Sequence, residues 1–265
     1  VTLSGGLNLN WYKSFQYKLV DDLMGGDFYL NVDKFAERDL VDPLAAENDL
    51  NKPNQVIEEG DKYGYDYTAK INKYDLLILA DFNYRKFFYF VAVMLSYDYF
   101  WGTGHLLIVK FPNDSYGDSE KHSFMNYGVK AGATYKVTGR HLIDVNAFYT
   151  TRAPYFRTAY ISPRTRNEVI EGLTNEKIFS GDLSYIYRSP YVQARVTGSY
   201  TKFNDGLYSR SFYHETLRSF VNYQMTGVDK VHLGTELGIE GKVTANFTLY
   251  GVFAMGQYYF DSNPT

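Results

Sequence analysis

The feature that most constrains this chain is a long-range alternation of apolar and polar residues, which recurs along nearly its whole length. In the stretch 124–137, for example, Val129 and Tyr135 fall on one face while Asn126 and Lys130 fall on the other. Successive side chains of a β-strand point to opposite faces of a sheet, so this period of two predicts strands with one apolar and one polar face. Segments with a helical period are scarce.

The alternation predicts nine strands, most of them longer than a soluble protein normally uses. They are expected at about 3–14, 62–84, 87–103, 123–137, 140–152, 176–188, 191–203, 231–242 and 246–260. A strand that crosses a bilayer with a tilt needs about 9–11 residues, whereas soluble strands have a mode of about 5–6. The strand lengths therefore favour a membrane setting.

The connections between these strands alternate between short and long. Short ones are expected near 85–86, 138–139, 189–190 and 243–245, and long ones at about 15–61, 104–122, 153–175 and 204–230. Short periplasmic turns and long extracellular loops are typical of outer-membrane proteins. The predicted fold is all-β: an antiparallel, up-and-down segment of a transmembrane β-barrel.

Aromatic and charged residues agree with this prediction. Tyr and Phe number 27 and 19, and many of them lie near the ends of the predicted strands, as in the aromatic girdles of a barrel. In the clearly alternating strands the charges share one face, and a Lys or Arg on the lipid face costs about 2–4 kcal/mol at the bilayer midplane. The stretches 76–79 and 88–95 are almost continuously apolar, so their facing stays open.

Composition and spacing exclude several other functions. The chain has no Cys, and its net charge of −3 gives no basic surface for nucleic acid. The five histidines have no zinc-ligand spacing, and none lies in mid-strand, where a barrel hydrolase would need a base. We therefore expect no enzyme activity, no cofactor and no metal site.

Several segments form a recognisable series along the chain: Asn10–Lys13, Asp22–Leu30, Asn126–Tyr135, Gly139–His141 continuing to Thr151–Pro154, Gly172–Lys177 leading to Gly181–Tyr185, and Gly234–Leu237. In the same order, these segments resemble the barrel of TonB-dependent receptors, particularly those of Bacteroidetes-type bacteria. The segment Gly181–Tyr185 departs mildly from the family pattern, because Asp182 and Ser184 stand where Glu and Gly are usual.

The resemblance implies a receptor of the bacterial outer membrane that actively imports a scarce nutrient. Its partners would be outer-membrane lipid, a plug domain that fills the barrel, the TonB complex, and a nutrient that the sequence does not identify. An odd number of strands and a chain that stops at Thr265 lead us to expect that residues 1–265 are one part of a barrel domain, with the plug and further strands outside it.

Two sets of residues are candidates for contacts inside such a protein. Polar residues on the predicted inner face would meet the plug or water in the lumen: Lys130, Asp144, Asn146, Arg195, Glu236 and Glu240. Aromatic residues of the predicted long loops would either stack on a ligand or pack loop against loop: Tyr155, Phe156, Tyr160, Tyr208, Phe212 and Tyr213.

Two other functions remain open at this point. A passive, porin-like pore would have an open lumen and would conduct ions without TonB. A soluble or surface-attached β-rich binding protein would also alternate along its strands, and it would be a water-soluble monomer.

Overall fold

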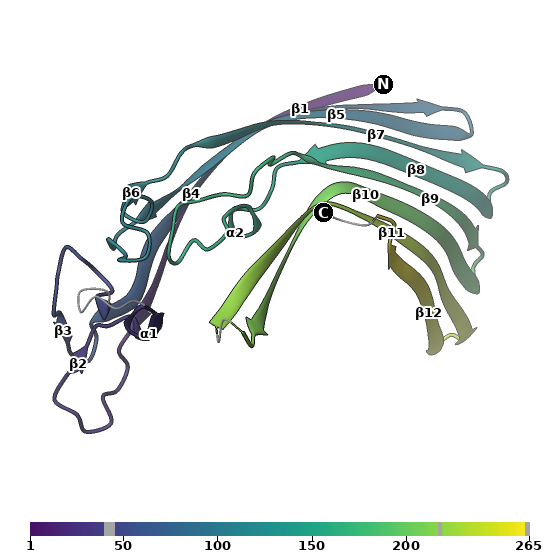
Figure 1. Ribbon diagram of the computed structural model, residues 1–265. Coiled ribbons are helices and arrows are strands. Elements are labelled where there is room, and N and C mark those ends of the chain that lie inside the picture. Colours follow the sequence, from purple (N-terminus) through teal and green to yellow (C-terminus); the bar gives the residue numbers. More distant parts are fainter. Residues whose placement is uncertain (40–45, 217–218, 263–265) are drawn as a thin grey trace.

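The computed structural model, which describes residues 1–39, 46–216 and 219–262, has one large antiparallel sheet bent into an arc and a small two-stranded sheet in the first long loop (Figure 1). Its long strands are β1 (Thr2–Leu19), β4 (Lys62–Tyr84), β5 (Phe87–Gly104), β7 (His122–Lys136), β8 (His141–Arg152), β9 (Glu176–Arg188), β10 (Val192–His214), β11 (Ser219–Thr244) and β12 (Phe247–Phe260). The short elements are β2 (Tyr29–Leu30), α1 (Lys34–Asp39), β3 (Val56–Ile57), β6 (Gly117–Asp118) and α2 (Phe156–Ala159).

Each long strand pairs with the next long strand along the chain, in the order β1-β4-β5-β7-β8-β9-β10-β11-β12, and β6 adds to β5. This up-and-down order confirms the nine predicted strands. Within the described residues, β1 and β12 are the two edges and do not pair with each other. None of the helices in this part of the chain is long and apolar enough to cross a membrane.

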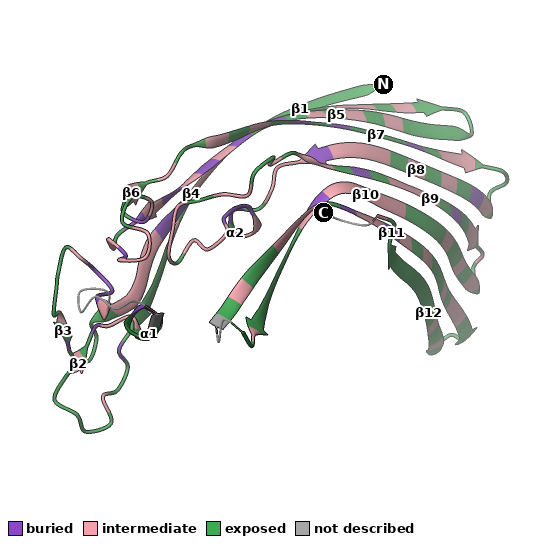
Figure 2. Cartoon of the chain, viewed as in Figure 1, coloured by how far each residue is buried: buried purple, intermediate pink, exposed green. Residues whose placement is uncertain are grey.

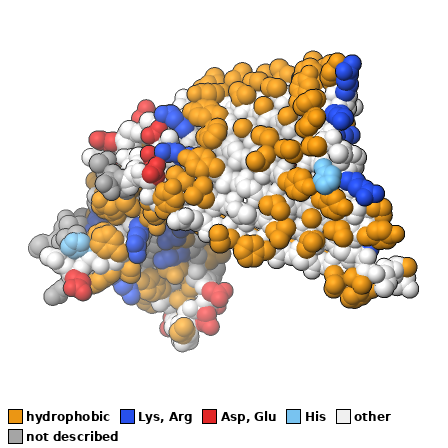
Figure 3. Space-filling model, turned by 90° about the vertical axis from the view of Figure 1, so that its right-hand side faces the viewer, with side chains coloured by type: hydrophobic (Ala, Val, Ile, Leu, Met, Phe, Trp, Pro, Cys, Tyr) orange, Lys and Arg blue, Asp and Glu red, His pale blue; other side chains and the backbone are white. Residues whose placement is uncertain are grey.

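Residue pairing between strands assigns the two faces of the sheet. Val93 lies opposite Ile78 on β4 and Val129 on β7, and all three side chains point outward. Partners that lie directly opposite in an antiparallel pair share a face, so this relation carries across the sheet. The outer face is apolar and solvent-exposed from strand to strand, as at Leu7, which is 69% exposed, and Val145. Hydrophobic side chains accordingly spread over the surface of the sheet in Figure 3.

The opposite face lies on the inside of the arc and is therefore concave, and α2 packs on this face (Figure 1). Buried residues gather where α2 and the neighbouring loops meet β4, β5 and β7 (Figure 2). Most other strand residues are intermediate or exposed, so the buried core is small and lies at the long-loop end of the sheet.

The pairing also settles the facing of the two apolar stretches. Leu76 and Ile78 lie opposite Leu95 and Val93 on the outer face. Leu77 therefore points inward, together with Leu79, Phe88, Phe90, Ala92 and Met94. The inner face is thus apolar near the β4–β5 turn, and this is why the sequence shows no alternation there.

The predicted long loop at 204–230 is wrong, because this stretch is a continuation of β10 and β11. The two strands remain paired out to His214 and Ser219. The sequence Asn204-Asp205-Gly206 has the composition of a turn, but here it forms a bulge, with Asp205 at φ 58° and a register shift between Phe203 and Gly206. The chain therefore bends at this point and pairing resumes beyond it.

Gly132 on β7 is a position where the inner face has no room for a side chain. A Cβ there would lie 2.3 Å from Asn146 Oδ1 and 2.5 Å from a ring carbon of Phe90. We expect Gly132→Val to lower the free energy of unfolding by about 1–3 kcal/mol, since overpacking forces neighbouring side chains from their rotamers. Thermal unfolding of the detergent-solubilised protein measures this. The control is Gly198→Val, because a Cβ at Gly198 would have no neighbouring atom within 4 Å. Equal losses of unfolding free energy in both variants would contradict the prediction.

Candidate functional site

The connection between β8 and β9 folds into the arc instead of extending away from the sheet. Its helix α2 places Phe156 and Tyr160, which are 8% and 1% exposed, against Phe100 on β5 and Ala69 on β4. The ring centroids of Phe156 and Tyr160 are 4.5 Å apart. Burial of two large aromatic rings holds this loop on the concave face.

Polar contacts fix the same loop to the β5 side of the arc. The Tyr160 hydroxyl accepts a hydrogen bond from the Gly102 N–H at 3.0 Å and lies 2.6 Å from Ser119 Oγ. Ser119 Oγ donates to the Glu120 carbonyl at 3.0 Å, so Tyr160 is the donor in their shared bond. Burial raises the pKa of Tyr160 and keeps this phenol protonated, as that donation requires.

At its other side the loop reaches the extended β10–β11 hairpin. Asn222 Nδ2 on β11 donates to the Ile161 carbonyl at 3.0 Å, and Asn222 Oδ1 accepts from Ser211 Oγ at 2.5 Å. The loop therefore spans the arc from β5 to β11. The hairpin that sequence reasoning missed supplies the second attachment.

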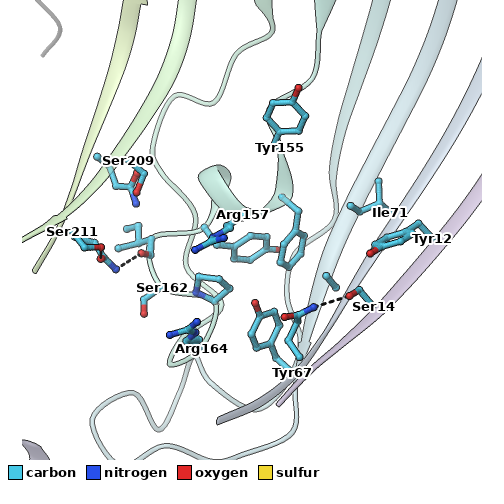
Figure 4. Close-up of a pocket in the computed structure, with 18 residues that line it drawn as sticks. Tyr12, Ser14, Tyr67, Ile71, Tyr155, Arg157, Ser162, Arg164, Ser209 and Ser211 are labelled. Atoms are coloured by element: carbon cyan, nitrogen blue, oxygen red, sulfur yellow. Dashed lines mark hydrogen bonds between the residues drawn. The ribbon is translucent and has the colours of Figure 1, made fainter. Parts of the chain in front are cut away.

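This loop, the inner faces of β1 and β4, and the β10–β11 hairpin together enclose a cavity of ≈ 530 Å³ (Figure 4). Cavities of about 300–1,000 Å³ are typical of small-molecule sites. The lining is mostly hydroxyl, amide and aromatic side chains: Tyr12, Ser14, Gln16, Tyr67, Ala69, Ile71, Tyr155, Phe156, Arg157, Tyr160, Ile161, Ser162, Pro163, Arg164, Ser209, Ser211, Asn222 and Gln224. We take it as the candidate ligand site.

The predicted aromatic residues divide between this cavity and other places. Tyr155, Phe156 and Tyr160 line it, but Phe156 and Tyr160 are buried in the loop packing, and only Tyr155 offers a largely exposed ring. The other three are strand residues of β10. Alternation along β10 places Tyr208 and Phe212 on the face opposite Ser209 and Ser211, while Tyr213 packs on Phe220 with centroids 5.5 Å apart.

Four of the predicted inner-face residues form a polar cluster across β8, β9, β10 and β11. Asn146 Nδ2 donates to Asp144 Oδ2 at 3.0 Å, and Arg195 Nη2 lies 3.9 Å from Asp144 Oδ2. Asn146 also donates to Asp182 at 3.1 Å. Glu236 lies on the same face opposite Thr197. Asn146, Asp182, Arg195 and Glu236 line a depression of the sheet.

Lys130 and Glu240 share the inner face but lie apart from that cluster. Lys130 Nζ is 5.7 Å from the Phe90 ring centroid, and Glu240 lies opposite Gln193 near the short-turn end. No group of three or more His, Asp or Glu that could hold a metal ion occurs in the described part of the chain.

Sequence reasoning missed the arginines of the cavity and the polar residues that β1 and the hairpin contribute. One signal was available in the loop. Residues 153–167 contain three Arg and no Asp or Glu, and this basic run lies between two strands of mixed charge. No comparable signal marks Ser14 or Gln224, because their role depends on which strands come together in space.

The comparisons with known proteins rest on the fold. No family model matches the sequence. No curated protein matches it either. Among solved structures, the copper transporter OprC aligns with a TM-score of 0.64 at 11% identity, over 96% of this chain and 35% of that one.

Two further structures belong to the same group. The ferric-catecholate import receptor Fiu from E. coli K12 aligns with a TM-score of 0.60 at 11% identity, over 98% of this chain and 35% of that one. The FrpB iron transporter from Neisseria meningitidis aligns with a TM-score of 0.50 at 14% identity, over 74% of this chain and 26% of that one. At 11–14% identity this likeness shows the fold alone: the chain has the fold of part of each of these three proteins. The chain spans only 26–35% of the length of these proteins.

Tyr160 provides a test of how the loop is held. We expect Tyr160→Phe to loosen the loop by about 1 kcal/mol, since the change removes one donor and one acceptor at Ser119 and Gly102. The readout is the rate of limited proteolysis within 153–175. The control is Tyr116→Phe, at an exposed ring of the neighbouring loop. Equal cleavage of Tyr160→Phe and the unmodified protein would show that ring packing alone holds the loop.

Proposed function

We propose that this chain forms part of the barrel of a TonB-dependent transporter, which takes up a scarce nutrient across the bacterial outer membrane. The observation that carries the proposal is a single up-and-down sheet of long strands whose convex face is apolar and whose concave face is polar over most of its area. The structural similarity to three transporters supports it.

The apolar outer face argues against a soluble binding protein. Exposed apolar side chains continue from β1 to β12 without a covering layer in the described residues. Soluble monomers rarely expose apolar patches larger than a few hundred Å². Outer-membrane lipid would cover this face. Where neighbouring strands overlap, each strand between the edges pairs with two neighbours, as a lipid environment requires.

The open edges support a longer barrel around this segment. β1 and β12 each leave one side without a paired strand in the described chain. An exposed edge presents unpaired N–H and C=O groups, which a bilayer does not tolerate. We propose that further strands close the barrel and that a plug domain occupies its interior.

The proposed function is tested in cells that carry the complete gene. We expect the protein in the outer-membrane fraction, and we expect growth on its limiting nutrient to be lost when TonB is deleted. A matched strain in which an unrelated porin supplies that nutrient controls for general effects of the deletion. Growth that is independent of TonB, together with ion conductance of the purified protein in bilayers, would instead indicate a passive pore.

The inner polar cluster makes a separate prediction about the plug. We expect Arg195→Gln combined with Glu236→Gln to weaken plug docking while membrane insertion stays intact, since both side chains lie on the concave face. Bilayer conductance should rise as the plug loosens. Arg210→Gln, on the opposite face of β10, serves as the control. Loss of insertion in the double variant would contradict the assigned facing.

A further inference from the structure

The four arginines of the β8–β9 connection and its borders are in two different electrostatic situations. Arg152 pairs with Glu176, its Nε lying 3.0 Å from Oε2, and Arg166 pairs with Glu168 at 2.5 Å. Arg157 and Arg164 form no ion pair with any described carboxylate, and both are exposed. These two unpaired guanidinium groups are the ones that line the cavity.

The rest of the lining does nothing to cancel their charge. None of the described residues that line the cavity is Asp or Glu. Arg164 Cζ lies 4.7 Å from the ring centroid of Tyr65, and this contact leaves the edge of the guanidinium group available for hydrogen bonds. In Figure 4 Arg157, Ser162 and Arg164 lie together on the loop, between the β10–β11 hairpin and the strands that carry Tyr12 and Tyr67.

A second observation shows that the site is polar and incompletely satisfied. Gln224 lines the cavity from β11, and its Oε1 is buried without a hydrogen-bond partner. Buried polar atoms in proteins are nearly always paired, so this oxygen is an unsatisfied acceptor in the wall of the cavity. Because an amide can present its oxygen or its nitrogen, it can accept from a ligand hydroxyl or donate to a ligand carboxylate.

We propose that this cavity binds a small organic anion through Arg157 and Arg164, with the ligand's oxyanion groups facing the loop. A guanidinium group matches a carboxylate or phosphate with two parallel hydrogen bonds, which gives both strength and orientation. Ser209 and Gln224 line the same cavity, and in this proposal they meet the ligand's remaining polar atoms. The proposal rests on the proposed function, since it names the class of nutrient that the transporter takes.

The experiment titrates the complete detergent-solubilised protein with tricarballylate, which carries three carboxylates, by calorimetry at low salt. Its trimethyl ester is the neutral probe of similar shape, and inorganic phosphate distinguishes phosphate from carboxylate recognition. We expect tricarballylate or phosphate to bind and the ester not to bind. Arg157→Gln and Arg164→Gln should each weaken binding about tenfold or more, as expected for loss of a charged hydrogen-bond partner.

The control variant is Arg140→Gln, which removes the same charge at the short turn between β7 and β8, far along the sheet from the cavity. Thermal unfolding of every variant shows that it is folded. Failure of both anions to bind, or equal binding by the two loop variants and the Arg140→Gln control, would overturn the proposal. If anion binding depends on the two arginines but uptake does not need TonB, the anion site is confirmed. The proposed transport function alone is then overturned.

Discussion

Backbone hydrogen bonding between neighbouring strands is the constraint on which everything else in this structure depends. Each strand between the two edges pairs with the strand before it and the strand after it, so pairing is continuous from β1 to β12 and shifts register only at a few bulges. Because side chains alternate, one continuous register places one residue set on the convex face and the other on the concave face. A slip by one residue in any pair would turn every apolar side chain of that strand inward.

The two faces of the sheet therefore differ in chemistry. On the convex face, branched and aromatic side chains form a continuous apolar surface. On the concave face, polar groups bond to one another across strands, as Asn146 does with Asp144 and Asp182. Glycine at 132 leaves space for Asn146 and for the ring of Phe90. The inner surface near the β4–β5 turn is apolar instead, so the concave face offers a lumen or plug domain two chemically different regions.

How far the sequence predicts this arrangement depends on whether a feature is local. Strand positions and short turns follow from alternation, which each segment carries by itself, and β4, β5 and β8 lie within a residue or two of expectation. The predicted long loop at 204–230 is wrong because the turn composition of Asn204-Asp205-Gly206 is local, whereas the pairing that overrides it is not: β10 and β11 gain a long ladder of backbone hydrogen bonds when the chain bulges and continues. Likewise Leu77 and Leu79 have no alternation to assign them, and only pairing with β1 and β5 determines their face.

The candidate site was predicted only in part for the same reason. Tyr155, Phe156 and Tyr160 were recognised as loop aromatics, but a sequence does not show that the loop turns inward, because that depends on the cluster with Ala69 and Phe100. Once the loop turns inward, it crosses the polar concave face. The side chains of the strands then determine which groups lie near the charges of the loop. Arginines at its borders find Glu176 and Glu168, while those between them face a wall of hydroxyl and amide groups. The positive charge in this cavity is therefore uncompensated because the strands and the loop place none of their described carboxylates in its lining.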